Sequence, residues 1–245
     1  MIAFVKMHAQ GNDFVVIGDG RTPPPPVDAQ LARAICARRF GIGCDQLLVL
    51  APANGADAAM TIFNADGSTA QNCGNGVRCA GWWLMEQLGK GAVRLALCDR
   101  TVAVRRSQAG VRAELGPVVI EARTPAYTDL RVGNPHRVWW QTPPEDALEM
   151  PSRNFEIVGG ESDEDLWIEI IERGVGRTLA CGSGAAAAAA ALWVRREQTH
   201  PVRVHMPGGV VRVSGSLENV VIEAPAYPVF TGRFDPATLL AAQEC

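Results

Sequence analysis

The sequence is poor in lysine and has no surplus of positive charge. Of its 23 lysine and arginine residues only Lys6 and Lys90 are lysines, and neither lies in an obvious setting for a pyridoxal-phosphate Schiff base. The basic residues are scattered among 26 acidic ones and the formal net charge is -3, whereas a nucleic-acid-binding protein needs a basic face. We therefore expect neither a pyridoxal-phosphate cofactor nor a nucleic-acid partner.

Long apolar runs and metal-binding patterns are also missing. The longest apolar run, residues 179–194, is mostly alanine and glycine and is too weakly hydrophobic to span a bilayer. Residues 1–6 lack the basic and long apolar regions of a cleaved signal peptide. The seven cysteines are irregularly spaced without a Cys-x-x-Cys pair, which fits a reducing compartment better than disulfides or zinc. We expect a cytoplasmic protein with no metal and no membrane partner.

One short pattern occurs twice in the chain. Residues 72–76 read Asn-Cys-Gly-Asn-Gly, and residues 180–184 read Ala-Cys-Gly-Ser-Gly. In both copies a strand-like run and a polar turn come first, and a helix-forming segment follows. A cysteine at a helix start meets the positive end of the helix dipole, which favours the thiolate. The glycines let a ligand approach the N–H groups of the helix start, which suit a carboxylate or a phosphate.

The equivalent cysteines, Cys73 and Cys181, indicate a two-base proton transfer. One thiolate would remove a proton from a carbon atom and one thiol would deliver a proton to its other face, as a racemase requires. The alternative is that each is a small inert hydrophobe, as most cysteines are. His136 could equally be a turn residue, and Glu172-Arg173 a solvated charge pair. The duplication favours the functional interpretation.

The 245 residues and the internal repetition predict two domains. We place the first at residues 1–116 and the second at residues 117–233, and we expect the segment from about 234 to 245 to return to the first domain. The seven consecutive alanines at 185–191 predict a helix so slender that it can lie inside a curved sheet.

Periodicity predicts the other elements. Helices are expected after Asp28, a plausible N-cap, and from Cys73 to the glycines near residue 89. The expected strands are residues 2–6, 13–17, 47–50, 58–64, 93–97, 101–105, 111–115, 129–132, 137–141, 155–158, 166–171, 202–205, 210–213 and 220–224.

Taken together, the motifs resemble those of the diaminopimelate epimerases, the cofactor-independent enzymes of lysine and peptidoglycan-precursor synthesis. The similar stretches follow the family order over nearly the whole chain. They are residues 6–8, 11–14, 41–46, 63–68, 72–78, 133–136, 172–174 and 180–184.

The resemblance implies an α/β (α+β) fold of two similar domains, each a curved, mostly antiparallel sheet wrapped around a central helix. It implies an active site in the interdomain cleft and a homodimer. It also implies that Cys73 and Cys181 are the thiol and thiolate pair, and that His136 and Glu172 modulate their pKa values.

The resemblance further implies how a substrate is held. The reacting carboxylate would lie on the backbone of residues 74–75 and 182–183, which are Gly74, Asn75, Gly182 and Ser183. The other implied binding residues are Asn12, Gln46, Asn64, Asn134, Asn154, Glu172 and Arg173.

The implied reaction is epimerisation of LL-2,6-diaminopimelate, a diamino dicarboxylate, to its meso form. The sequence departs from the family's usual pattern at Ala9, Gly18 and Arg177, and Arg177 adds charge near a catalytic loop. The nearest alternative is a racemase of another amino acid, such as histidine, on the same fold. An alternative of another class is an amino-acid-binding or redox-sensing protein in which the two cysteines form a disulfide.

Overall fold

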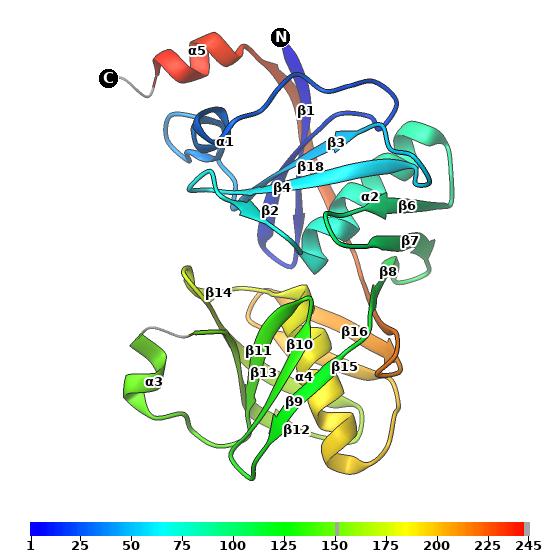
Figure 1. Ribbon diagram of the computed structural model, residues 1–245, viewed down its shortest axis with the longest axis vertical. Coiled ribbons are helices and arrows are strands. Elements are labelled where there is room, and N and C mark those ends of the chain that lie inside the picture. Colours follow the sequence, from blue (N-terminus) through cyan, green and yellow to red (C-terminus); the bar gives the residue numbers. More distant parts are fainter. Residues whose placement is uncertain (150–151, 243–245) are drawn as a thin grey trace. The chain divides into compact units, whose positions relative to one another are not determined.

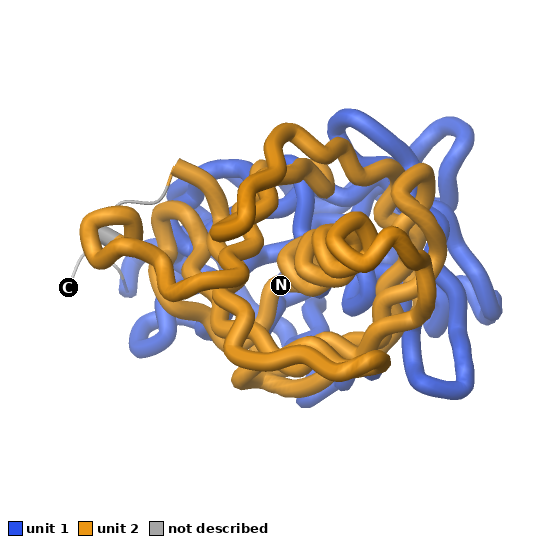
Figure 2. Tube along the Cα trace, turned by 90° about the horizontal axis from the view of Figure 1, so that it is seen from below, with its two compact units in different colours: residues 1–9, 13–111, 225–245 blue, residues 10–12, 112–224 orange. Residues whose placement is uncertain are grey.

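The computed structural model describes residues 1–149 and 152–242. The chain divides into two compact units, shown in different colours in Figure 2. Unit 1 holds residues 1–9, residues 13–111 and the chain from residue 225 onward, and unit 2 holds residues 10–12 and 112–224.

These boundaries differ from the predicted ones. The first unit ends after Val111, within a strand, and the chain returns to it at Pro225 rather than near residue 234. The reason is β18 (Tyr227–Phe234), which pairs antiparallel with β1 (Ile2–Ala9) over nearly its whole length. A strand that completes the sheet of unit 1 belongs to that unit.

Unit 1 is built on a mixed sheet in the order β18-β1-β2-β3-β4-β6-β7, with β5 also paired to β4 (Figure 1). β2 runs parallel to β3 and β4 parallel to β6, while β3-β4 and β6-β7 are antiparallel. The two-residue turn Gln10-Gly11 joins β1 to β2, with positive φ of 52° and 82°. The remaining strands are β2 (Asn12–Ile17), β3 (Gln46–Ala51), β4 (Ala58–Asn64), β5 (Thr69–Ala70), β6 (Ala92–Ala96) and β7 (Thr101–Ser107).

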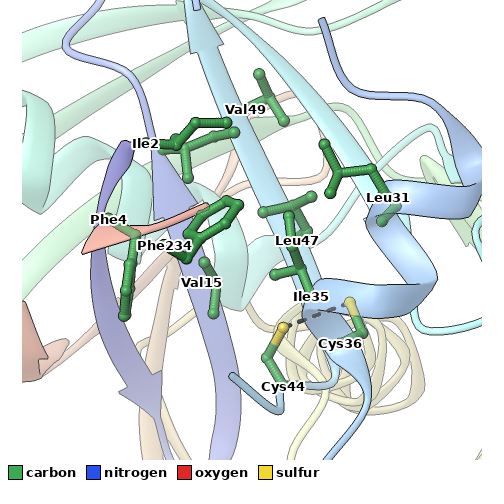
Figure 3. Packing of buried hydrophobic residues seen from close by; sticks show 12 residues of the cluster. Ile2, Phe4, Val15, Leu31, Ile35, Cys36, Cys44, Leu47, Val49 and Phe234 are labelled. Atoms are coloured by element: carbon green, nitrogen blue, oxygen red, sulfur yellow. Dashed lines mark hydrogen bonds between the residues drawn. The ribbon is translucent and has the colours of Figure 1, made fainter. Parts of the chain in front are cut away.

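The helix α1 (Ala29–Cys36) begins after Asp28, as predicted, because the Asp28 Oδ1 accepts a hydrogen bond from the Leu31 N–H at 2.8 Å. Its inner side packs against the sheet in the cluster of Figure 3. The buried members of this cluster are Ile2, Phe4, Val15, Ile17, Leu31, Ala32, Ile35, Cys36, Cys44, Leu47, Val49 and Phe234.

The helix α2 (Gly74–Leu88) is the central helix of unit 1, since it contacts β1, β3, β6 and β7. It ends at Gly89, whose φ of 64° is the left-handed conformation that glycine adopts readily. The predicted extent of α2 is therefore confirmed. The short α5 (Pro236–Ala241) lies beside α1.

Unit 2 carries a second mixed sheet in the order β9-β10-β11-β12-β13-β15-β16-β17-β8. Only the pairs β11-β12 and β13-β15 are parallel among the pairs whose register is described. The elements are β8 (Gly110–Gly116), β9 (Val119–Arg123), β10 (Tyr127–Val132), β11 (Asn134–Trp139), α3 (Glu145–Glu149), β12 (Asn154–Glu161), β13 (Asp165–Glu172), β14 (Gly176–Thr178), α4 (Gly182–Arg196), β15 (Val202–Met206), β16 (Gly209–Gly215) and β17 (Val220–Ala224).

The alanine helix α4 lies inside the curve of this sheet, as the sequence predicts. It contacts β10 to β13 and β15 to β17, and Figure 2 shows the unit 2 trace encircling a helix. The alanines at 185–191 are all 0% exposed, because small side chains allow strands to approach the helix from every side. Within residues 1–149 and 152–242, no helix is long and apolar enough to cross a membrane.

Candidate active site

Cys73 and Cys181 are the N-cap residues of the central helices α2 and α4. Each has an extended backbone, with φ of -151° and -132°, and each sulfur accepts a hydrogen bond from the backbone N–H three residues later. The donor is Gly76 at 3.3 Å in unit 1 and Gly184 at 3.4 Å in unit 2. Sulfur thus takes the position that a serine or aspartate oxygen occupies in most helix caps. The predicted repeat of a cysteine opening a helix is confirmed.

In unit 1, two predicted binding residues lie opposite each other on neighbouring strands. Gln46 of β3 pairs in register with Asn64 of β4, and the Gln46 Nε2 donates to the Asn64 Oδ1 at 2.9 Å. The Asn64 Nδ2 donates in turn to the Ser68 Oγ at 3.0 Å. Both amides are partly exposed and are held in one orientation, so they can meet a polar ligand with little further ordering.

Arg78 is a charged residue of unit 1 that the sequence did not single out for the site. It lies one turn into α2, is 0% exposed, and its Nη2 donates to the Asn75 Oδ1 at 2.7 Å. Burial lowers the pKa of Arg78 to about 10, while the charges of Cys79 and Cys73 act to raise it. A guanidinium remains charged at that value, so it places a positive charge near the capping sulfur.

Cys181 in unit 2 has different surroundings. Its Sγ lies 3.5 Å from the Ser183 Oγ. Burial raises the pKa of the Cys181 thiol well above its usual value, and the negative charges of Glu172 and Glu156 raise it further. Hydrogen bonds from Ser183 and Gly184 act in the opposite direction but do not cancel this. The N–H of Gly184 at the helix start does lower the pKa of Cys181, as expected, but burial and the two carboxylates outweigh it and favour the thiol.

Glu172, predicted to modulate a cysteine, does lie beside Cys181. Burial raises the pKa of Glu172, although hydrogen bonds from Thr178 and Cys181 lower it. The Thr178 Oγ1 donates to the Glu172 Oε1 at 2.7 Å. The two groups thus oppose each other's ionisation, because each negative charge destabilises the other.

Glu156 is a second charged residue that the sequence did not single out for the site. It lies on β12 and is 0% exposed, and its Oε1 is 2.8 Å from the Nδ1 of His136, which is also 0% exposed. His136 pairs in parallel register with Asn154, two residues before Glu156. The available signal was a glutamate inside an apolar strand, on the same face as Asn154.

The other predicted residues of unit 2 have mixed positions. The Asn154 Oδ1 accepts from the Arg173 N–H at 3.0 Å, which fixes the start of the turn after β13, while the Arg173 side chain is exposed. Asn134 opens β11 and is half-buried. Arg177 forms an exposed ion pair with Glu169 of β13.

Unit 2 thus brings His136, Asn154, Glu156, Glu172 and Cys181 together on one side of its sheet and at the start of α4. Among the described residues, no group of three or more His, Cys, Asp or Glu side chains is arranged so that it could hold a metal ion. The chemistry that this arrangement can perform is proton transfer at a thiol flanked by carboxylates and an imidazole.

Solved structures share this fold. One is a predicted epimerase from Pseudomonas aeruginosa, with a TM-score of 0.74 and 15% identity over 96% of this chain and 99% of the other. Another is a hydroxyproline epimerase from Agrobacterium vitis with bound trans-4-hydroxy-L-proline, with a TM-score of 0.69 and 14% identity over 94% and 91%. The chain therefore has a two-domain α/β fold, of a class whose solved members include epimerases.

The sequence comparison is more specific. The family model described as diaminopimelate epimerase matches residues 4–121 and 148–224. The diaminopimelate epimerase of Xanthomonas oryzae pv. oryzae is 36% identical over 96% of both chains, and that of Sphingopyxis alaskensis is 36% identical over 95% of this chain and 97% of the other. The chain belongs to the diaminopimelate epimerase family.

Proposed function

We propose that the protein converts LL-2,6-diaminopimelate to the meso form, a step of lysine biosynthesis, by direct proton exchange at Cys73 and Cys181. The observation that carries the proposal is that each unit caps its central helix with a cysteine sulfur. Two equivalent acid–base groups are what the inversion of one carbon centre requires.

The reaction balances without a co-reactant. The thiolate of one cysteine takes the proton from the reacting carbon and becomes a thiol, and the electron pair of the broken C–H bond stays on that carbon. The thiol of the other cysteine then gives its proton to the opposite face and becomes a thiolate. Backbone N–H groups at residues 74–75 and 182–183 would stabilise the negative charge that spreads onto the adjacent carboxylate.

Two observations support diaminopimelate as the substrate: the similar proteins are diaminopimelate epimerases, and the chain carries polar side chains that suit its charged groups. Diaminopimelate carries an ammonium and a carboxylate at each end, and the exposed Arg173 guanidinium suits the distal carboxylate. The linked amides of Gln46 and Asn64 suit either charged group. We also infer the homodimer that the resemblance implies, for which sedimentation should give about twice the 26.2 kDa of the chain.

Serine at either cysteine tests the proposal. We expect Cys73→Ser and Cys181→Ser each to lower kcat for LL-diaminopimelate by about 100- to 10,000-fold, because a hydroxyl is a far weaker acid–base group at neutral pH. The control is Cys98→Ser, at an exposed cysteine, which should keep the activity of the unmodified protein. Full activity in either single variant, with a normal circular dichroism spectrum, would contradict the proposal.

A further inference from the structure

The carboxylate of Glu156 lies where a glycine, Gly184, leaves room for it. A Cβ atom added to Gly184, in the first turn of α4, would lie 2.5 Å from the Glu156 Oε1 and 3.2 Å from the Cys181 Cβ. Any larger residue at position 184 would therefore displace the carboxylate or the helix start. The carboxylate is held directly beside the turn that carries Cys181.

The carboxylate is also fully withdrawn from solvent. Glu156 and His136 are both 0% exposed, and a single 2.8 Å contact joins the Oε1 of one to the Nδ1 of the other. Among the described residues, the second carboxylate oxygen of Glu156 and the Nε2 of His136 have no hydrogen-bond partner. Burying such groups costs free energy, and a hydrophobic pair would usually be at least as stable. Stability alone therefore does not account for this pair.

We propose, on the basis of the proton exchange proposed above, that Glu156 is a positioning residue that accepts the Nδ1–H of His136. The contact selects one tautomer of the imidazole and leaves the Nε2 lone pair as a buried proton acceptor in the half-site of Cys181. A carboxylate that orients a histidine in this way is the arrangement found in many acid–base and nucleophilic sites.

Four ionisable groups face one another here, namely His136, Glu156, Glu172 and Cys181. The negative charge of Glu156 raises the pKa of both Glu172 and Cys181. Glu156 therefore has a second effect, which is to add to the burial and to the Glu172 charge that favour the thiol form of Cys181.

Ring-nitrogen NMR tests the tautomer without reference to catalysis. In protein labelled with ¹⁵N at histidine, the signals of His136, assigned by their loss in His136→Asn, should show a protonated Nδ1 and an unprotonated Nε2. In Glu156→Gln, which keeps the shape and removes the charge, these signals should move. A protonated Nε2 with an unprotonated Nδ1 in the unmodified protein, or unchanged signals in the variant, would overturn the proposal.

Kinetics distinguishes a positioning role from a structural one. Glu156→Gln should lower kcat by about 10- to 100-fold with little change in KM, as loss of a supporting group typically does. In the direction in which Cys181 delivers the proton, the alkaline limb of the kcat profile should move to lower pH, because one charge that raises the Cys181 pKa is gone. Glu156→Asp should restore part of the rate.

The outcomes separate the two proposals. If the unmodified protein does not epimerise LL-diaminopimelate, the proposed function fails, while the tautomer of His136 is still decided by NMR. If the unmodified protein is active and Glu156→Gln loses only thermal stability, with an unshifted pH profile, the positioning role fails. A variant that does not fold leaves the decision to the ring signals of the unmodified protein.

Discussion

Asp13 lies between two cations in unit 1. Its carboxylate accepts hydrogen bonds from the Lys6 Nζ at 2.5 Å and from the Arg38 guanidinium at 2.8 and 3.0 Å. Burial is the largest single influence and raises the pKa of Asp13, but the hydrogen bonds from Arg38 and Lys6 together hold that pKa well below its usual range. The ionised carboxylate therefore stabilises the fold above the unfolded-state value of about 3.9, and this contribution is lost as the pH falls through the folded-state pKa.

We expect Asp13→Asn to lower the free energy of unfolding by about 1–3 kcal/mol at pH 7, because Lys6 loses its charged partner. The loss should be smaller at pH 3, because there the ionised Asp13 carboxylate already contributes less to the stability of the unmodified protein. Urea unfolding at both pH values measures the difference, and Asp99→Asn, at an exposed carboxylate, is the control. Equal losses for Asp13→Asn at the two pH values would show that its charge is not responsible.

At the scale of residues, the sequence predicts positions better than it predicts surroundings. The capping role of Cys73 and Cys181 follows from a local Cys-Gly-x-Gly pattern, because caps depend on neighbouring residues only. Glu156 was missed because its burial depends on the pairing of β11 with β12 and on the approach of α4. The thiol state of Cys181 was missed for the same reason, since burial by the surrounding sheet, together with the carboxylates on neighbouring strands, outweighs the helix start.

At the scale of elements, α4 depends on the small size of its side chains. Ala188 lies in the middle of the alanine run and is fully buried. We expect Ala188→Leu to lower the free energy of unfolding by about 1–3 kcal/mol, because the larger side chain must push a strand away from the helix. Chemical denaturation measures this.

The matched control is Ala29→Leu, at an exposed position of α1. That substitution should change the free energy of unfolding by no more than about 0.5 kcal/mol. If Ala188→Leu were equally mild, α4 would not be enclosed by the sheet of unit 2.

Long apolar periodic elements were predicted closely, and the exposed ones were missed. The predicted strand at 58–64 coincides with β4, and the strands at 155–158 and 166–171 pair antiparallel as β12 and β13. β18 was not predicted because its sequence shows no alternation of apolar and polar residues. Its Tyr227 and Val229 are 50% and 57% exposed, so only pairing with β1 defines the strand.

At the scale of the whole molecule, the two units share one arrangement, but the buried charges near the cysteine sulfur have opposite signs. In each, a curved sheet surrounds a helix that a cysteine caps. In unit 1 the buried charge that interacts with the capping sulfur is the cation Arg78. In unit 2 the nearby charges are Glu156 and Glu172, which favour the thiol form of Cys181. The proposed proton exchange with a substrate needs one thiolate and one thiol.

The two-unit plan was predictable from the repeated motif, but its boundaries were not. Turn signals such as Gly116-Pro117 mark the ends of strands, whereas unit membership depends on which strands pair. Pairing between β1 and β18 joins the two ends of the chain, and a local pattern cannot reveal such a contact.

The most direct test of the proposed exchange is to incubate the reduced protein with LL-diaminopimelate in D₂O and to follow α-deuterium incorporation and stereochemistry together. We predict deuterium gain at the inverted carbon with conversion to the meso form, because the proton delivered by the second thiol has exchanged with solvent. Folded, reduced protein that neither incorporates deuterium nor forms the meso isomer would contradict the proposed reaction, and the same assay with other amino acids, histidine included, would then find the substrate.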